Sequence, residues 1–229
     1  MRITRREMSF LDRHLETRMD HRHLEANPRV RYGFYLRPTY EMSRAQAEIH
    51  DLLRRQFGLD VGGKFMPHAT VMSFFRSDAS IEEIKSALDD SLAGRSMFAV
   101  TNSGPMPHKR SGVSLDIHHD DDGTPNVALQ AVHDAVYKAI VPLVHPACEF
   151  AFNGWAGEHF RAHLTLAMAD IPDFLFDEVL GIIRSAEPIG PRRFPAEYFT
   201  LYAFQSDDWG GAWWETMVWQ VLGSWRLGA

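Results

Sequence analysis

The sequence predicts an α+β fold: a duplicated, two-lobed unit in which antiparallel sheets flank a central groove and helices cover the outer faces. Two observations support this prediction. The order strand, helix, strand, helix, strand occurs twice along the 229 residues. In addition, the same short string, His-x-Thr, stands in the second strand of each copy.

The charge balance and the cysteine content argue against several function classes. With 24 Lys and Arg against 30 Asp and Glu, the net charge of −6 argues against a protein that coats long duplex nucleic acid, although a small phosphorylated ligand in a local pocket remains compatible with it. The single cysteine, Cys148, excludes an internal disulfide and a multi-cysteine metal site. No signal peptide is visible, and the longest apolar run, 139–144, is too short to span a membrane. We therefore expect a cytoplasmic protein with no membrane contact, and a monomer.

The chain divides into an extension and a main body. Residues 1–27 are charged and rich in histidine, and Leu11, Leu15 and Met19 recur at helical spacing, which predicts one amphipathic helix on the outside of the main body. Residues 28–229 form the main domain, with a first lobe at about 30–103 and a second at about 112–222.

In the first lobe, strands are predicted over 30–36, 68–75 and 97–102, because these segments are rich in aromatic and β-branched residues. Helices are predicted over 44–57 and 81–93. Each has an apolar stripe and a capping box, formed by Ser43 with Gln46 and by Ser80 with Glu83.

The second lobe repeats this order. Strands are predicted over 112–119, 159–168 and 198–204, with a final strand over 216–222 after a Trp-rich hairpin. Helices are predicted over about 127–141 and from Pro172 onward.

The two His-x-Thr strings place their polar side chains together. Side chains alternate along a strand, so His68 and Thr70 emerge on one face, as do His163 and Thr165. The opposite face is apolar in both copies, with Ala69 and Val71 in the first and with Ala162, Leu164, Leu166 and Met168 in the second. If the two lobes meet, the two His/Thr pairs flank one groove.

Two imidazoles and two hydroxyls across a groove suit hydrolysis of a phosphodiester. One neutral histidine can accept a proton from the nucleophile, while a protonated histidine donates one to the leaving oxygen. Threonine hydroxyls can donate hydrogen bonds to the phosphate oxygens as charge develops. This division of labour requires neither a metal nor a cofactor.

The strings PHATV and AHLTLA, together with the opening FYLRP strand, resemble the two motifs of the 2H phosphoesterase superfamily, which includes 2′-5′ RNA ligase-like proteins and cyclic nucleotide phosphodiesterases. The resemblance covers about residues 30–222. It implies a bilobal fold and metal-independent action on 2′,3′-cyclic phosphates or 2′,5′-linked nucleotides. It assigns acid/base catalysis to His68 and His163, and phosphate binding to Thr70 and Thr165. The implied substrate is a small nucleotide or an RNA terminus.

Strand parity and residue type add candidates for substrate binding. Arg161 and Lys64 lie an even number of residues before His163 and His68, so each is expected on the same strand face as that histidine and could bind phosphate. Trp213 could stack on a nucleobase. The remaining candidates are Tyr35, Arg37, Trp209 and Trp214. For each of them, packing or a surface charge is the simpler interpretation.

Several alternatives remain open. His159 and His163 have the spacing of a helical zinc pair, but the segment is predicted as a strand and no third ligand is apparent, which disfavours a zinc hydrolase. His118-His119 precedes three aspartates that could bind a cation, but a solvated turn is the commoner explanation there. His108, His133 and His145 are interpreted as ordinary surface or core histidines. At the level of function, the alternatives are a nucleotide- or RNA-binding protein with little turnover, and a 2′-5′ RNA ligase acting on tRNA halves. The net charge disfavours the ligase.

Overall fold

The computed structural model describes residues 24–150 and 157–228. The helix predicted over 1–27 therefore lies outside the described residues, apart from its last four positions. At the start of the described chain, Leu24 is buried and its carbonyl accepts a hydrogen bond of 3.2 Å from the Tyr32 hydroxyl.

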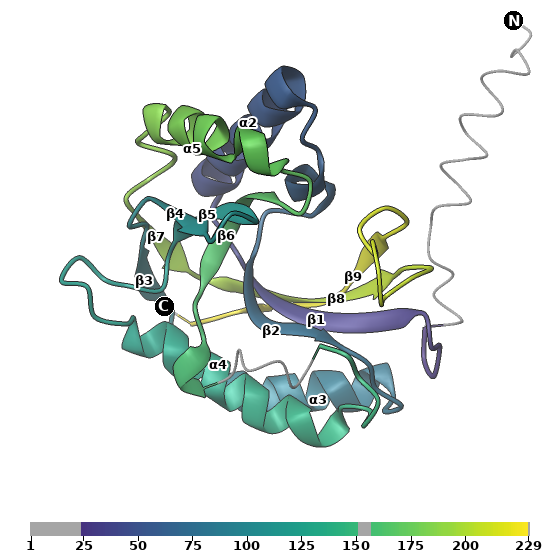
Figure 1. Ribbon diagram of the computed structural model, residues 1–229. Helices are drawn as coiled ribbons and strands as arrows, with labels where there is room; N and C mark the ends of the chain where they lie inside the picture. Colours follow the sequence, from purple (N-terminus) through teal and green to yellow (C-terminus); the bar gives the residue numbers. More distant parts are fainter. Residues whose placement is uncertain (1–23, 151–156, 229) are drawn as a thin grey trace, which may run out of the picture.

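Within the described residues, the fold is built on a seven-stranded antiparallel sheet and a separate two-stranded sheet (Figure 1). The order in the large sheet is β4-β5-β6-β2-β1-β8-β9, and β3 pairs with β7. The strands are β1 (Val30–Arg37), β2 (Ala69–Phe75), β3 (Phe98–Thr101), β4 (Pro105–His108), β5 (Gly112–Asp116), β6 (His163–Met168), β7 (Arg193–Ala196), β8 (Tyr198–Gln205) and β9 (Val218–Arg226). The predicted α+β class and the antiparallel pairing are confirmed.

The two motif strands lie next to each other at the centre of this sheet. β2 and β6 are joined at the residue pair Ala69 and Leu164. The strands of the two predicted lobes therefore share sheets and do not form one sheet per lobe: β2 pairs with β6 and β1 with β8 in the large sheet, and β3 pairs with β7 in the small one. The motifs meet at the junction of β2 and β6.

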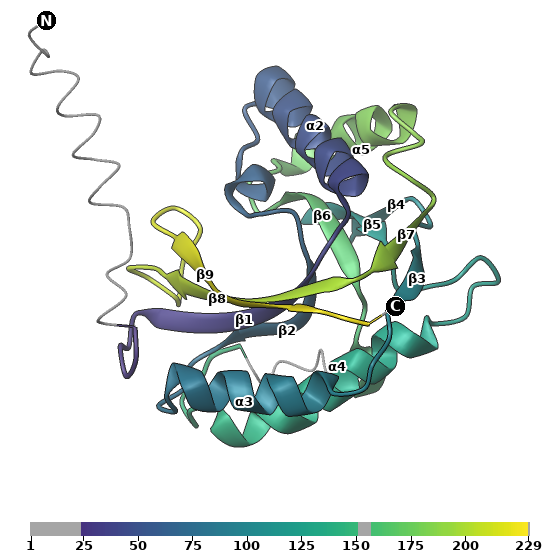
Figure 2. The same ribbon diagram turned by 180° about the vertical axis from the view of Figure 1, so that it is seen from behind.

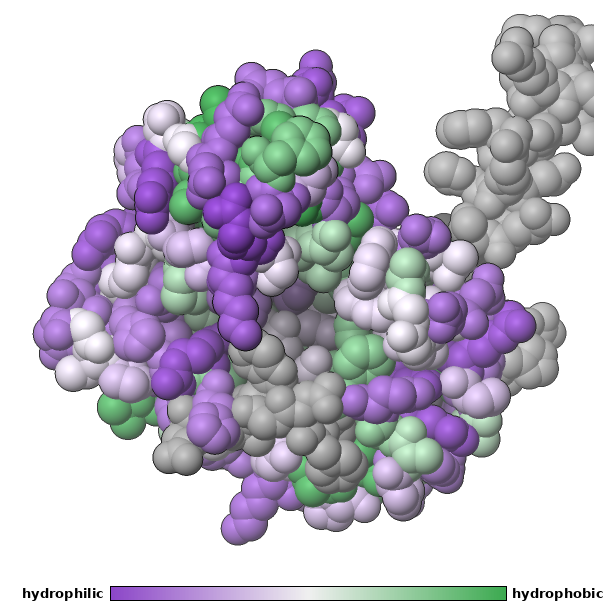
Figure 3. All heavy atoms as spheres, in the orientation of Figure 1, coloured by the Kyte–Doolittle hydropathy of each residue, from purple (hydrophilic) through white to green (hydrophobic). Residues whose placement is uncertain are grey.

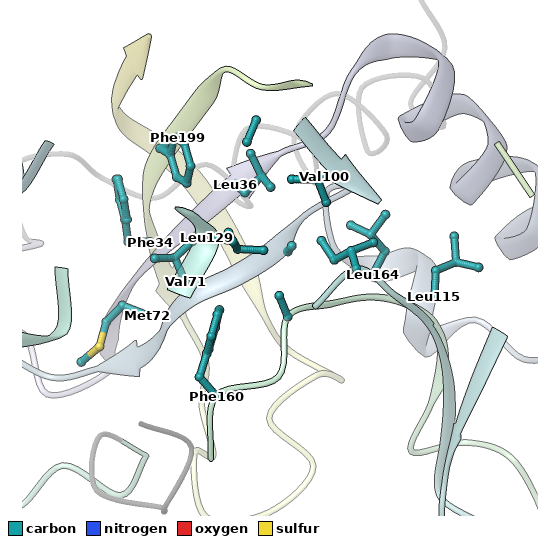
Figure 4. Close-up of a cluster of buried hydrophobic side chains, with 14 of the residues drawn as sticks. Phe34, Leu36, Val71, Met72, Val100, Leu115, Leu129, Phe160, Leu164 and Phe199 are labelled. Carbon is teal, nitrogen blue, oxygen red and sulfur yellow. The ribbon is translucent and has the colours of Figure 1, made fainter. Parts of the chain in front are cut away.

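Four α-helices in the described residues cover the sheet: α2 (Tyr40–Phe57), α3 (Ile81–Leu92), α4 (Val127–Ile140) and α5 (Phe176–Ser185). Figures 1 and 2 show α3 and α4 side by side beneath β1 and β2, whereas α2 and α5 lie together above β4, β5 and β6. The core between these layers contains large apolar side chains from both halves of the sheet and from α4 (Figure 4).

The capping predictions for the first two helices have different outcomes. The box of Ser80 and Glu83 is present at the start of α3. The box predicted from Ser43 is wrong, because α2 begins earlier, with Thr39 as its N-cap. Ser43 lies inside the helix and donates to the Pro38 carbonyl, while Gln46 is buried against the second motif strand.

Some strand boundaries also differ from the prediction. The strand predicted from residue 159 begins only at His163, because residues Gly157–His159 form a 3-10 turn. The strand predicted over 112–119 ends at Asp116. Strands β4 and β7 were not predicted, since both contain proline, which removes a backbone donor and is tolerated at sheet edges. In the described chain, no helix combines the length and the apolar character needed to cross a membrane.

Candidate active site

The pairing of β2 with β6 brings the two His-x-Thr motifs together. Ala69 lies opposite Leu164 in an antiparallel register, and both side chains are buried. Continuing the antiparallel register by one residue on each side sets His68 against Thr165 and Thr70 against His163. Residues opposite one another on adjacent strands lie about 5 Å apart. All four polar side chains line the same cavity.

Both motif strands have a β-bulge directly after the threonine. In β2, Thr70 pairs with Tyr35 and Met72 with Phe34, so Val71 is the extra residue. In β6, Thr165 pairs with Ser114 and Ala167 with Val113, so Leu166 is the extra residue. A bulge bends a strand and changes the direction of the side chains that follow. For this reason Met168, predicted to lie on the apolar face, instead lines the cavity.

The two motif histidines are held in the same way. The Nδ1 atom of His68 lies 2.7 Å from the Met66 carbonyl oxygen, and Nδ1 of His163 lies 2.8 Å from the Arg161 carbonyl oxygen. A carbonyl can only accept, so Nδ1 must carry the proton in both rings. This hydrogen bond fixes the tautomer and leaves Nε2 as the atom available to a ligand.

Burial keeps both imidazoles neutral. The pKa of His68 is lowered to about 4: desolvation is the largest cause, the Met66 carbonyl opposes it, and the nearby His163 and His50 add to the lowering. Desolvation also lowers the pKa of His163, against the opposing effects of the Arg161 carbonyl and Asp116. At neutral pH, each Nε2 is therefore an unprotonated acceptor.

The cavity has a volume of about 360 Å³ and contains no carboxylate among the described residues that line it. Figure 3 shows the surface hollowed near its centre, between the part that carries α2 and the β8–β9 hairpin. The titratable basic side chains of the lining are His68, His108, His133, His163 and Arg161. This lining suits an anionic ligand.

Aromatic rings surround one side of the cavity. The ring of Tyr35 lies edge-on to the His68 ring, with 4.8 Å between the centroids, and that of Phe65 lies 5.6 Å from it. Phe65 in turn contacts Trp213, with 5.6 Å between their centroids. A nucleobase could stack against such rings.

Helix α2 supports the second motif through two side chains one turn apart. The Gln46 amide nitrogen and the His50 Nε2 atom both donate to the Thr165 carbonyl oxygen, at 2.8 and 2.9 Å. The Gln46 Oε1 atom is buried without a hydrogen-bond partner in the described structure, and Gln46 lines the cavity. The helical pattern predicts that these residues share a face, but not that the face would meet the second motif.

The accessory candidates divide into two groups. Tyr35, Arg161 and Trp213 line the cavity. Arg37 lies over the Tyr198 ring and Lys64 is paired with Asp60 at 3.5 Å, and neither contributes to the lining. Trp209 and Trp214 also lie outside the lining, although both contact Trp213. Sequence reasoning missed His108, whose ring centroid lies 5.0 Å from that of His163.

The histidines considered as metal ligands have other surroundings. His159 is exposed in the 3-10 turn, and His118 is buried with its ring against that of His119. The Nδ1 atom of His119 bonds to Asp116 at 2.8 Å, and Asp120 accepts hydrogen bonds from Thr101 and Asn126. Among the described residues, no group of three or more His, Cys, Asp or Glu side chains is placed to hold a metal ion.

Comparison with known proteins identifies a family. The model of the 2′-5′ RNA ligase superfamily matches residues 40–208. A comparison with curated proteins gives no match. Among solved structures, TT0787 of Thermus thermophilus is similar with a TM-score of 0.56 and 16% identity, over 86% of this chain and 97% of that chain. The apo form of E. coli LigT is similar with a TM-score of 0.51 and 16% identity, over 87% of this chain and 98% of that chain. At these identities, the two structures show a shared fold.

Proposed function

This chain belongs to the 2′-5′ RNA ligase superfamily, and on that basis we propose that it is a phosphodiesterase acting by two-histidine acid/base catalysis without a metal. The substrate would be a 2′,3′-cyclic phosphate or a 2′,5′ phosphodiester of a nucleotide, a cyclic oligonucleotide or an RNA end. The observation that carries the proposal is the matched geometry of the two motifs. Each histidine commits Nδ1 to a backbone carbonyl and keeps Nε2 for the cavity that both histidines line.

In this reaction a water molecule attacks the phosphorus atom. The neutral Nε2 of one histidine accepts a proton from the water, and a new P–O bond forms. The bond from phosphorus to the ribose oxygen breaks, and the other histidine, whose Nε2 takes up a proton when the anionic phosphate binds beside it, donates that proton to the ribose oxygen. The products are a phosphate monoester and a free hydroxyl, and the two histidines have exchanged protonation states.

The two threonines stabilise the charge that develops on the phosphate. Both residues line the cavity, and the register places each threonine opposite the histidine of the other motif. In the described structure neither hydroxyl has a hydrogen-bond partner within the protein, so both can donate to non-bridging oxygens. Arg161, which also lines the cavity, adds positive charge to it.

A product assay on a substrate panel tests this function. The panel contains 2′,3′-cyclic mononucleotides, 2′,5′-linked diadenylate and 3′,3′-cyclic dinucleotides, each with EDTA and with the His68→Ala variant as control. We expect hydrolysis of one of the first two classes that resists EDTA and requires His68. Loss of activity with EDTA and its return with zinc or manganese would contradict the metal-free mechanism. A folded protein that binds these nucleotides but turns over none would instead indicate a binding protein.

A further inference from the structure

The cavity has two chemically different ends, one around each motif histidine. Tyr35 and Phe65 surround His68 with aromatic carbon. Around His163 the neighbours are the imidazole of His108 and, through it, the hydroxyl of Ser114. The aromatic end suits a nucleobase, whereas the other end presents polar groups.

The fold fixes His108 at this position. It is the last residue of β4, and it pairs with Gly112 of β5. Its Nε2 atom lies 2.9 Å from the Ser114 hydroxyl, and Ser114 is 1% exposed and pairs directly with Thr165. Gly112 allows the hairpin to approach β6 closely, because a Cβ there would lie 2.9 Å from the Ala167 carbonyl oxygen. His108 is thus held against the second motif by a part-buried hydrogen bond.

The lining of the cavity suits an anion. Arg161 is among the lining residues, and no carboxylate is among the described residues that line the cavity. Desolvation lowers the pKa of His108 and the neighbouring His163 lowers it further, whereas the carboxylate of Asp116, which pairs with His163, acts in the raising direction. Its two oxygens accept hydrogen bonds from the His118 backbone N–H and from the His119 ring, both at 2.8 Å. An anion bound beside His108 would favour protonation of that ring and would gain a charge-assisted hydrogen bond.

We propose that His108 and Ser114 form a subsite for a second phosphate group of the substrate, next to the scissile phosphate at His163. This inference rests on the proposed phosphodiesterase function and narrows its substrate class. The substrate is an oligonucleotide with at least two phosphates, with a base at the aromatic end and its second phosphate at His108. A 2′,3′-cyclic mononucleotide has one phosphate and would leave this subsite empty.

Three forms of one substrate test the subsite. They are 2′,5′-linked diadenylate without a terminal phosphate, with a 5′-phosphate and with a 3′-phosphate. For the wild-type protein, we expect kcat/KM for one phosphorylated form to exceed that for the unphosphorylated form by about tenfold or more, the effect of one hydrogen bond to a charged group. The variant His108→Gln should reduce this ratio to near one.

The matched control is Lys109→Gln, which removes a full charge from the adjacent exposed residue, outside the cavity lining. This variant should keep the wild-type ratio. Equal kcat/KM values for the three forms with the wild-type protein would overturn the subsite and leave the phosphodiesterase function intact. An equal loss on all three forms in His108→Gln would also overturn it, because His108 would then act only through His163.

Calorimetry with the same three compounds separates the subsite from the reaction. If none of them is hydrolysed, the proposed function fails for 2′,5′ linkages, but the subsite still predicts that one phosphorylated form binds about tenfold more tightly and that His108→Gln removes the difference. Equal dissociation constants for the three compounds would overturn the subsite.

Discussion

Ala69 and Leu164 lie opposite each other across the junction of β2 and β6, and each is the middle residue of a His-x-Thr motif. Because the strands are antiparallel, this pair places His68 beside Thr165 and Thr70 beside His163. Each acid/base group thus shares its surroundings with the hydroxyl of the other motif. The two motifs form one site, and neither half of the sheet contains a complete one.

The threonine hydroxyls provide the first prediction. Thr70→Val and Thr165→Val should each lower kcat by about 10²–10³-fold, because each removes one donor to the charge that develops on the phosphate while it keeps the shape of the side chain. Steady-state kinetics on the preferred substrate measures this effect. The matched controls Thr70→Ser and Thr165→Ser retain the hydroxyl and should retain most of the activity. A valine variant as active as its serine counterpart would contradict the role.

The pH dependence of catalysis provides the second prediction. Catalysis requires one neutral and one protonated histidine, so kcat/KM is highest midway between the two pKa values of the free protein. Burial lowers the pKa of His68 to about 4 and lowers that of His163 as well. The optimum of kcat/KM should therefore lie below about pH 6.5, the ordinary pKa of histidine, and the rate should fall as the pH rises further, because the protonated acid becomes scarce. An optimum more than about one unit above that ordinary value would contradict the assignment.

Stacking of a nucleobase at the aromatic end of the cavity provides the third prediction. Trp213→Ala should raise KM by about 5- to 150-fold, which corresponds to about 1–3 kcal/mol for one stacked base. Trp213→Phe should retain most of the affinity. Trp219→Ala is the control, since Trp219 is exposed and lies outside the cavity lining. Equal KM values for Trp213→Ala and Trp219→Ala would place the base elsewhere.

The cap of α3 provides a prediction for stability. Ser80→Ala should lower the free energy of unfolding by about 1 kcal/mol, because the Ser80 hydroxyl accepts the hydrogen bond of the Glu83 backbone N–H. Denaturant unfolding measures the change, and kcat should stay constant because α3 does not line the cavity. Ser86→Ala, an exposed position within the same helix, should leave stability unchanged or raise it slightly. A similar loss in both variants would argue against the cap.

The sequence predicts most elements because their local patterns are strong. Alternation around His68 and His163 places the polar and apolar faces of the motif strands correctly as far as the threonines. Beyond them the prediction for Met168 fails, since a bulge depends on the partner strand and leaves no local signal. The spacing of Gln46 from Ser43 predicts a helix cap, whereas tertiary packing buries Gln46 against Thr165.

The residues that contact the motifs in space have weaker sequence signals than the motifs themselves. His108 follows Pro105 and Pro107, which disfavour a strand in the local pattern, although an edge strand tolerates them. Its contact with His163 arises from the pairing of β4, β5 and β6, which a single sequence does not specify. The division into two lobes remains a prediction, as does the helix over residues 1–27.

The most direct test of the account is the turnover of the preferred substrate, in EDTA, by the wild-type protein, His68→Ala, His163→Ala and the double variant, with circular dichroism to establish that each is folded. Groups that act as one catalytic unit give losses that do not add. We expect each single variant to lose about 10³-fold or more in kcat and the double variant to lose about as much as the more impaired single variant. Near-normal turnover in either single variant, or losses that multiply in the double variant, would contradict a concerted acid/base pair.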